Sequence, residues 1–175
     1  MRGRPPARLA EADRSTDLEA CREAALRLLE RQRRTRSDLE RRLRDKGYAG
    51  ATAAQVLDRL AEVGLVDDVE YARAFMAGRR ARRAAGARRI EQELRARGVG
   101  VGDIEAARLR LDAEQGGMDE LAGARKVVAQ AERRTRGLEP RVRRQRLYAL
   151  LARRGFDGDV IRRALDLPEE AGPEE

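Results

Sequence analysis

The sequence predicts an all-α protein made of three tandem three-helix repeats that form an elongated, curved array. Only 3% of the 175 residues are aromatic and 40% are charged, so a core has to be assembled from Leu, Ala, Val and Ile. Apolar residues recur at helical spacing in nine segments, which are separated by glycines and short polar joints. Three of these segments end in the same pattern, which indicates internal repetition.

Repeat 1 is expected over residues 17–66. Its second helix is predicted over Ser37–Lys46, where Ser37 and Glu40 have the spacing of a capping box. Thr52 and Gln55 repeat that spacing at the start of the third helix. The apolar positions assigned to the core are Leu18, Cys21, Ala25, Leu28, Leu29, Leu39, Leu43, Ala53, Val56, Leu60 and Val63.

Repeat 2 is expected over residues 67–114. Asp67 and Asp68 are the only carboxylate pair that resembles an acid–base site. They directly precede a helical run, so we interpret them as N-terminal caps that complement the helix dipole. The apolar positions assigned to this core are Ala72, Phe75, Met76, Ile90, Leu94, Ile104, Ala107 and Leu111.

Repeat 3 is expected over residues 115–167. Pro140 suits the first turn of its second helix, where a backbone N–H has no intrahelical partner. Residues 1–16 are expected to form a flexible basic tail and residues 168–175 an acidic one. The apolar positions assigned to the core are Leu121, Ala124, Val128, Ala131, Leu147, Leu150, Leu151, Val160, Ile161, Ala164 and Leu165.

The middle helices of the three repeats end alike. The pattern is typical of a Schellman stop, in which a glycine adopts the left-handed conformation and the next apolar residue folds back onto the helix. A cation before the glycine meets the negative end of the helix dipole. The three sequences are Leu39-x3-Leu43-x2-Lys46-Gly47-Tyr48, Ile90-x3-Leu94-x2-Arg97-Gly98-Val99 and Leu147-x3-Leu151-x2-Arg154-Gly155-Phe156.

The stop glycines are 51 and then 57 residues apart, and the residue nine positions after each is apolar: Val56, Ala107 and Ala164. A unit of about 50 residues buries little apolar surface, so neighbouring units are expected to pack end to end. One compact bundle of nine helices is the alternative.

The composition argues against catalysis and against a metal site. The sequence has no His, the commonest general base, and its one cysteine, Cys21, cannot form an intramolecular disulfide. It contains neither a glycine-rich phosphate loop nor an apolar run long enough to cross a membrane. We therefore expect a cytoplasmic protein that is not an enzyme and needs no cofactor. The net charge of +8 favours a polyanionic or acidic partner.

Several motifs, in the same order, resemble the RecX family of bacterial regulatory proteins. The central block reads Gly64-Leu-Val-Asp67-Asp68-x2-Tyr71-x3-Phe75, then Arg79, then Gly86-x3-Ile90-x3-Leu94-x3-Gly98-Val99. The N-terminal repeat of the family is similar to Ala25-Leu26 and Arg36-Ser37-x-Leu39-x3-Leu43-x2-Lys46-Gly47-Tyr48. Its C-terminal repeat is similar to Leu150-Leu151-x2-Arg154-Gly155-Phe156-x4-Ile161. The resemblance covers nearly the whole chain.

The resemblance implies a regulator of the RecA recombinase. Members of the family lie along the groove of the RecA–DNA filament and inhibit its ATP hydrolysis, strand exchange and coprotease activities, as part of the control of recombination, DNA repair and the SOS response. It implies no catalytic residues. We further expect weak binding to single- or double-stranded DNA alone, and a monomer. A curved array with a basic edge suits this task, because it can follow a helical polyanionic filament.

Arginines gather at comparable places in the three repeats and predict a basic edge that contacts the partner or DNA. The residues predicted to form this edge are Arg33, Arg34, Arg36, Arg79, Arg80, Arg82, Arg83, Arg88, Arg89, Arg143 and Arg144; Arg133, Arg134, Arg136 and Arg141 also belong to the group in repeat 3. A solvated face balanced by acidic neighbours is the alternative for each. A stand-alone nucleic-acid-binding protein and a helical adaptor for an acidic protein are the competing functions.

Overall fold

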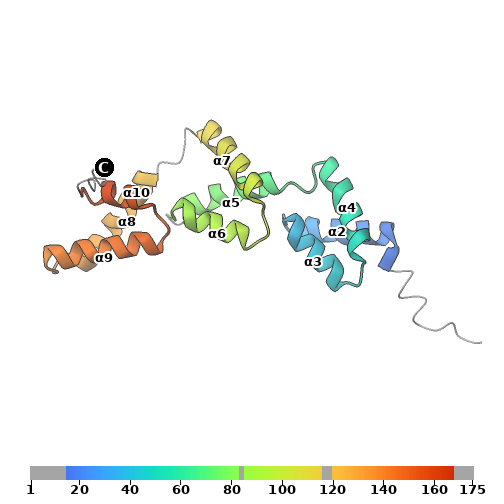
Figure 1. The fold of residues 1–175 in the computed structure, drawn as a ribbon, viewed down its shortest axis with the longest axis horizontal. Helices are drawn as coiled ribbons and strands as arrows, with labels where there is room; N and C mark the ends of the chain where they lie inside the picture. The colour runs from blue at the N-terminus through green and yellow to red at the C-terminus, as the bar shows by residue number, and fades with distance from the viewer. Residues whose placement is uncertain (1–14, 83–84, 116–119, 168–175) are drawn as a thin grey trace, which may run out of the picture.

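The computed structural model describes residues 15–82, 85–115 and 120–167, and within these ranges all regular structure is helical (Figure 1). The all-α prediction is therefore confirmed. The helices are α2 (Leu18–Arg31), α3 (Arg36–Asp45), α4 (Gly50–Glu62), α5 (Asp68–Arg82), α6 (Ala87–Arg95), α7 (Val101–Gln115), α8 (Glu120–Thr135), α9 (Pro140–Arg153) and α10 (Gly158–Ala164).

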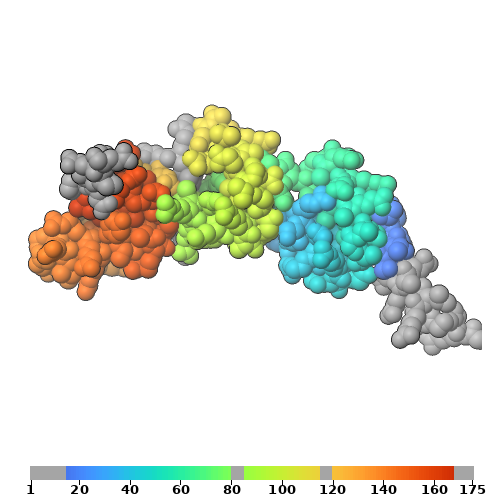
Figure 2. Space-filling model, in the orientation of Figure 1, coloured from blue at the N-terminus to red at the C-terminus, as the bar shows by residue number. Residues whose placement is uncertain are grey.

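Each set of three helices closes a hydrophobic core of its own. One core lies among α2, α3 and α4, the second among α5, α6 and α7, and the third among α8, α9 and α10. Among the described residues, no core cluster includes side chains of two sets. Figure 2 shows the consequence, three lobes in a row that form an elongated array. Three tandem three-helix repeats are thus confirmed, and the single compact bundle is wrong.

The three predicted Schellman stops are present. Gly47, Gly98 and Gly155 have φ angles of 92°, 79° and 81°. The next residue in each case is buried and donates its N–H back to a leucine carbonyl of the helix. These bonds join Tyr48 to Leu43 at 3.1 Å, Val99 to Leu94 at 3.2 Å and Phe156 to Leu151 at 3.2 Å.

Two predicted capping boxes are wrong. Helix α3 is capped by Thr35, whose Oγ1 accepts the N–H of Asp38 at 3.1 Å, so Ser37 already lies inside the helix. Helix α4 starts at Gly50 directly after the preceding glycine stop, which places Thr52 in its first turn as a buried residue. Val63, assigned to the core, is 68% exposed because α4 ends at Glu62.

Other helix starts follow the prediction. The Asp67 carboxylate accepts the N–H of Glu70 at 2.8 Å and so caps α5. Asp68 instead accepts the N–H of Arg36 at 2.9 Å, which caps α3 in the neighbouring repeat. Pro140 opens α9, as expected.

The middle helices α9, α6 and α3 follow one another head to tail along one side of the array (Figure 1). At the first joint, Thr35 Oγ1 donates to the carbonyl of Arg97 at 2.7 Å, so one side chain caps α3 and holds the end of α6. At the second joint, Gly86 at the start of α6 donates its N–H to the carbonyl of Arg154 at 2.9 Å. The repeats do pack end to end, and they do so through backbone and polar groups.

The joints require glycine for a second reason besides its backbone angle. A Cβ added at Gly98 would overlap the Cβ and Oγ of Ser37, and one added at Gly155 would lie 2.6 Å from the Cβ of Arg89. Gly47 has the same backbone conformation, but a Cβ there would meet nothing within 4 Å because no repeat packs on that end. Of the three middle-helix stops, one thus lies outside the joints and two lie within them.

This difference gives a matched pair of variants. Gly47→Ala introduces only the strain of positive φ, about 1 kcal/mol, whereas Gly98→Ala adds overpacking of about 1–3 kcal/mol. Urea unfolding followed by circular dichroism should therefore show a lower midpoint for Gly98→Ala than for Gly47→Ala. Equal midpoints for the two variants would mean that the joint does not need the space that glycine leaves.

Candidate partner and nucleic-acid interface

The structure divides the predicted basic edge into internal and exposed arginines. Arg83 and the side chains of Arg80 and Arg82 lie outside the described residues. Arg34 is an internal residue: its side chain is 9% exposed, donates to the carbonyl of Leu28 and pairs with Asp38 at 2.8 Å. Its contacts therefore lie within repeat 1 and stabilise that repeat.

Arg33 and Arg36 reach solvent but are also paired. Arg33 is 68% exposed and forms an ion pair of 2.9 Å with Glu70 of α5, which lies in the next repeat. Arg36 forms an ion pair of 2.6 Å with Asp58 of α4. Exposed pairs of this kind contribute little to stability, and their arginines can exchange a carboxylate for another anion.

Two carboxylates around the first joint are held ionised by arginines. Burial would raise the pKa of Asp38, but hydrogen bonds from Arg42, Arg34 and Arg41 outweigh it and bring the pKa to about 2. Hydrogen bonds from Arg73 and Arg33 hold the pKa of Glu70 at about 2. Glu70 therefore links the two repeats through charge.

Arg79 connects two helices of repeat 2. It pairs with Glu93 of α6, and its guanidinium lies 5.4 Å from the ring centre of Phe75. Arg97 lies over the same ring at 4.7 Å. These contacts leave the Arg79 side chain only 33% exposed.

Arg88 and Arg89 belong to the second joint. Arg88 pairs with Asp157 of repeat 3 at 2.6 Å, and Arg89 donates to the carbonyl of Arg153 at 3.3 Å. In repeat 3, Arg143 pairs with Glu132 at 2.9 Å, whereas Arg144 is exposed and forms no ion pair with a described residue. The predicted arginines are thus brought to the joints and to one end of the array.

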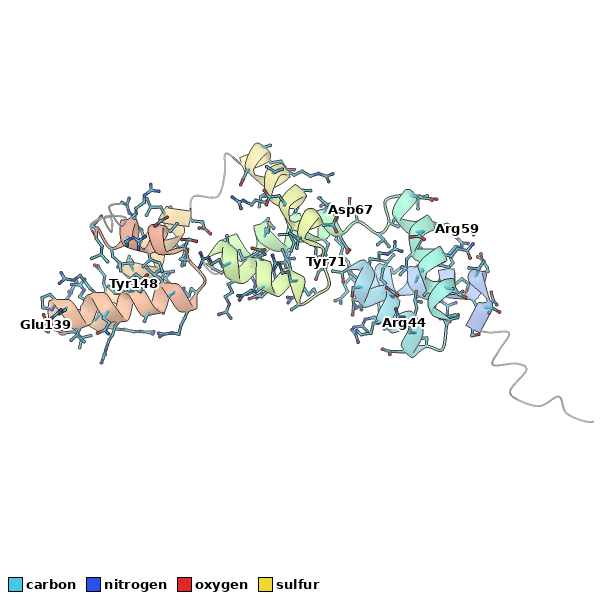
Figure 3. The ribbon with its side chains drawn as sticks, viewed as in Figure 1. Arg44, Arg59, Asp67, Tyr71, Glu139 and Tyr148 are labelled. Carbon is cyan, nitrogen blue, oxygen red and sulfur yellow. The ribbon has the colours of Figure 1, made fainter. Side chains whose placement is uncertain are left out.

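A cleft opens beside each joint. The one at the first joint has a volume of about 530 Å³, and the one at the second about 570 Å³. Arg97, at the end of α6, lines both. Tyr71 lies at the first cleft and Tyr148 at the second, and Figure 3 shows these tyrosines on different repeats. The array therefore presents two similar, arginine-lined hollows at successive joints.

All three repeats match known domains. Residues 21–60 match the first three-helix domain of RecX, residues 67–107 the second and residues 119–165 the third. The chain belongs to the RecX family. It is 40% identical over 156 residues to regulatory protein RecX of Mycolicibacterium vanbaalenii, with 85% of this chain and 82% of the relative covered. Regulatory protein RecX of Halorhodospira halophila is 42% identical over 160 residues, with 89% and 94% covered.

Solved structures of RecX show the same fold. The crystal structure of RecX from Lactobacillus salivarius aligns with a TM-score of 0.77 at 21% identity and covers 85% of this chain and 94% of its own. A second crystal structure of regulatory protein RecX aligns with a TM-score of 0.76 at 26% identity, with 95% and 82% covered. The RecX assignment indicates a regulatory role.

Two features are absent from the described residues. None of the described helices combines the length and the apolar character that a membrane span requires. No group of three or more potential metal-ligating side chains occurs in that part of the chain.

Acid should weaken the ion pairs that Glu70 makes with Arg73 in its own helix and with Arg33 across the first joint. The folded pKa of Glu70, about 2, lies below its ordinary value of 4.5, so the unfolded chain binds its proton first as the pH falls. The stability contributed by Glu70 is therefore complete above about 4.5 and is lost as the pH falls through about 2.

The urea midpoint of Glu70→Gln should be lower than that of the parent at neutral pH. The two midpoints should converge near pH 2. Glu23→Gln is the control, because the ion pair of Glu23 with Arg27 lies on the exposed face of α2 and joins no two repeats. Its pH profile should follow that of the parent. Parallel profiles of the parent and Glu70→Gln over the whole pH range would refute a stabilising role for Glu70.

Proposed function

We propose that this chain binds the RecA–DNA filament in the cytoplasm as a monomer and inhibits its ATP hydrolysis, strand exchange and coprotease activities, in the control of recombination, DNA repair and the SOS response. Membership of the RecX family over all three repeats supports this proposal most directly. The elongated array supports it as well. Units joined in a row can contact several successive subunits of a filament, and linked contacts bind more tightly than each alone.

The proposed mechanism is binding without chemistry by this chain. A regulator changes the turnover of a filament only if it binds one state of the filament more tightly than another. We assign the protein contacts to the surface around the two joint clefts, where the exposed Arg33, Arg36, Arg88 and Arg89 lie near the N-terminal starts of α3 and α6. Each of these arginines already pairs with a carboxylate of this chain. It can exchange that carboxylate for an acidic group of the bound protein.

A stand-alone nucleic-acid-binding protein is the second candidate. It is favoured by the uneven distribution of charge, because residues 115–167 carry 13 basic and 7 acidic side chains. This function would require tight DNA binding that is independent of the recombinase. Comparing inhibition of RecA with binding to bare DNA at the same salt concentration separates the two functions.

The joint variants test the proposed function. The parent chain should inhibit the ATPase of RecA on single-stranded DNA, and Gly47→Ala should inhibit equally well. Gly98→Ala should be at least about tenfold weaker, because a disturbed joint misaligns the repeats and removes the gain from linked contacts. Helical content by circular dichroism should stay at the parent level in both variants.

Failure of the parent chain to inhibit RecA would reject the proposed function. Equal potency of Gly98→Ala and Gly47→Ala, with the joint shown to be disturbed, would reject the extended array as its basis and favour one local docking site.

A further inference from the structure

The positive charge of the protein is concentrated in repeat 3. Residues 17–66 and residues 67–114 each carry 11 basic and 9 acidic side chains, a net +2 apiece. Residues 115–167 carry 13 basic and 7 acidic side chains, a net charge of +6. The arginines of the first two repeats are therefore largely balanced by acidic neighbours, and those of the third are not.

The excess charge lies at the free end of the array, around the turn between α8 and α9. Glu139 of this turn is at the far end of the molecule in Figure 3. Six exposed arginines there form no ion pair with any described residue. We call them the tip: Arg133, Arg134, Arg136, Arg141, Arg144 and Arg146. Two glutamates accompany them: Glu132 pairs with Arg143, and Glu139 accepts N–H groups of Arg141 and Val142.

A groove continues from the tip along α8 and α9. Its volume is about 380 Å³, and Arg134, Arg146 and Arg153 lie along it, each exposed and without an ion pair to a described residue. The groove wall between these cations is made by small and aliphatic side chains, Ala131, Thr135, Leu147, Ala149 and Leu150. The three arginines come from two helices and face one hollow, which is a feature that a merely solvated helix face lacks.

We propose that the tip and the α8–α9 groove bind the phosphodiester backbone of nucleic acid. Guanidinium groups match phosphate geometry, and close unpaired cations repel one another until a polyanion neutralises them. An acidic protein segment is a poorer occupant, because protein contacts are most often centred on buried aromatic anchors and no aromatic side chain lines the groove.

The same lining predicts which nucleic acid binds better. No aromatic side chain lines the groove, and Tyr148 of α9 lines the cleft at the second joint instead. The site therefore has no platform on which unpaired bases can stack, so its affinity should follow phosphate density. A duplex should bind more tightly than a single strand of the same length, without dependence on base sequence.

This inference rests on the proposed function and assigns the nucleic-acid part of the interface, and its main test needs no recombinase. The probe is a fluorescently labelled DNA duplex, titrated with the full chain from about 50 to 200 mM salt. The test variant replaces Arg134, Arg146 and Arg153 by Gln. The control replaces Arg31, Lys46 and Arg59 of repeat 1, which are also exposed and form no ion pair with a described residue. Both variants change the net charge by the same amount.

The test variant should lose at least about tenfold in affinity, and its slope of log affinity against log salt should shrink by about 2.7, the value for three lost phosphate contacts. The control should keep its slope within about 1 of the parent. Equal losses in both variants would show that affinity follows net charge, and an unchanged test variant would place DNA elsewhere. Either result overturns the proposal.

Two further outcomes separate the proposals. A test variant that binds duplex normally but no longer binds the recombinase filament would make the groove a protein contact, which also overturns the inference. A parent chain that binds duplex through the groove but does not inhibit RecA would leave the inference standing and reject the proposed function.

Discussion

The end-to-end contact between successive middle helices is the interaction on which the whole architecture depends. A left-handed glycine ends α6 and α9, and the first turn of the preceding middle helix occupies the space beside it. The positive N-terminal end of one helix dipole thereby meets the negative C-terminal end of the next. Glycine thus both ends one helix and leaves space for the first turn of the neighbouring helix.

The cores show why this contact determines the shape. Because each repeat buries its own apolar side chains, no core shared among the described residues holds two repeats in a fixed relation. Their relation is set by a small number of bonds at each joint, such as those of Thr35 and Gly86, together with ion pairs between repeats. The stability of such an array is the sum of the repeats and of their neighbouring contacts, so a single joint can be weakened without unfolding a core.

The repeats were predictable because each helix stop depends on residues that are close together in the sequence, and the same stop motif occurs three times. The caps at Ser37 and Thr52 were wrong because capping-box spacing also occurs by chance inside helices. Thr35, which caps α3 instead, also donates a hydrogen bond to the carbonyl of Arg97, 62 residues away. Local sequence spacing cannot show such a long-range contact. Asp68 likewise caps a helix of another repeat.

The site was predictable in its chemistry and less so in its location. Arginine density indicated a basic surface, but pairing decides which arginines are available, and pairs such as Arg33 with Glu70 join distant segments. Arg34 and Arg79 belong to the densest runs and are largely internal. The net charge of each repeat, which is also readable from the sequence, points to repeat 3 more directly than the density of arginine does.

The central claim is that the stop of one middle helix is bonded to the start of another. Amide hydrogen exchange of Gly86 tests it most directly, since the N–H of this N-cap residue has no partner within its own helix and its bond to Arg154 crosses the second joint. The account predicts that this amide is protected in the parent and exchanges much faster in Gly155→Ala, while the amides within α7 are unaffected. Fast exchange of Gly86 in the parent itself would contradict the account.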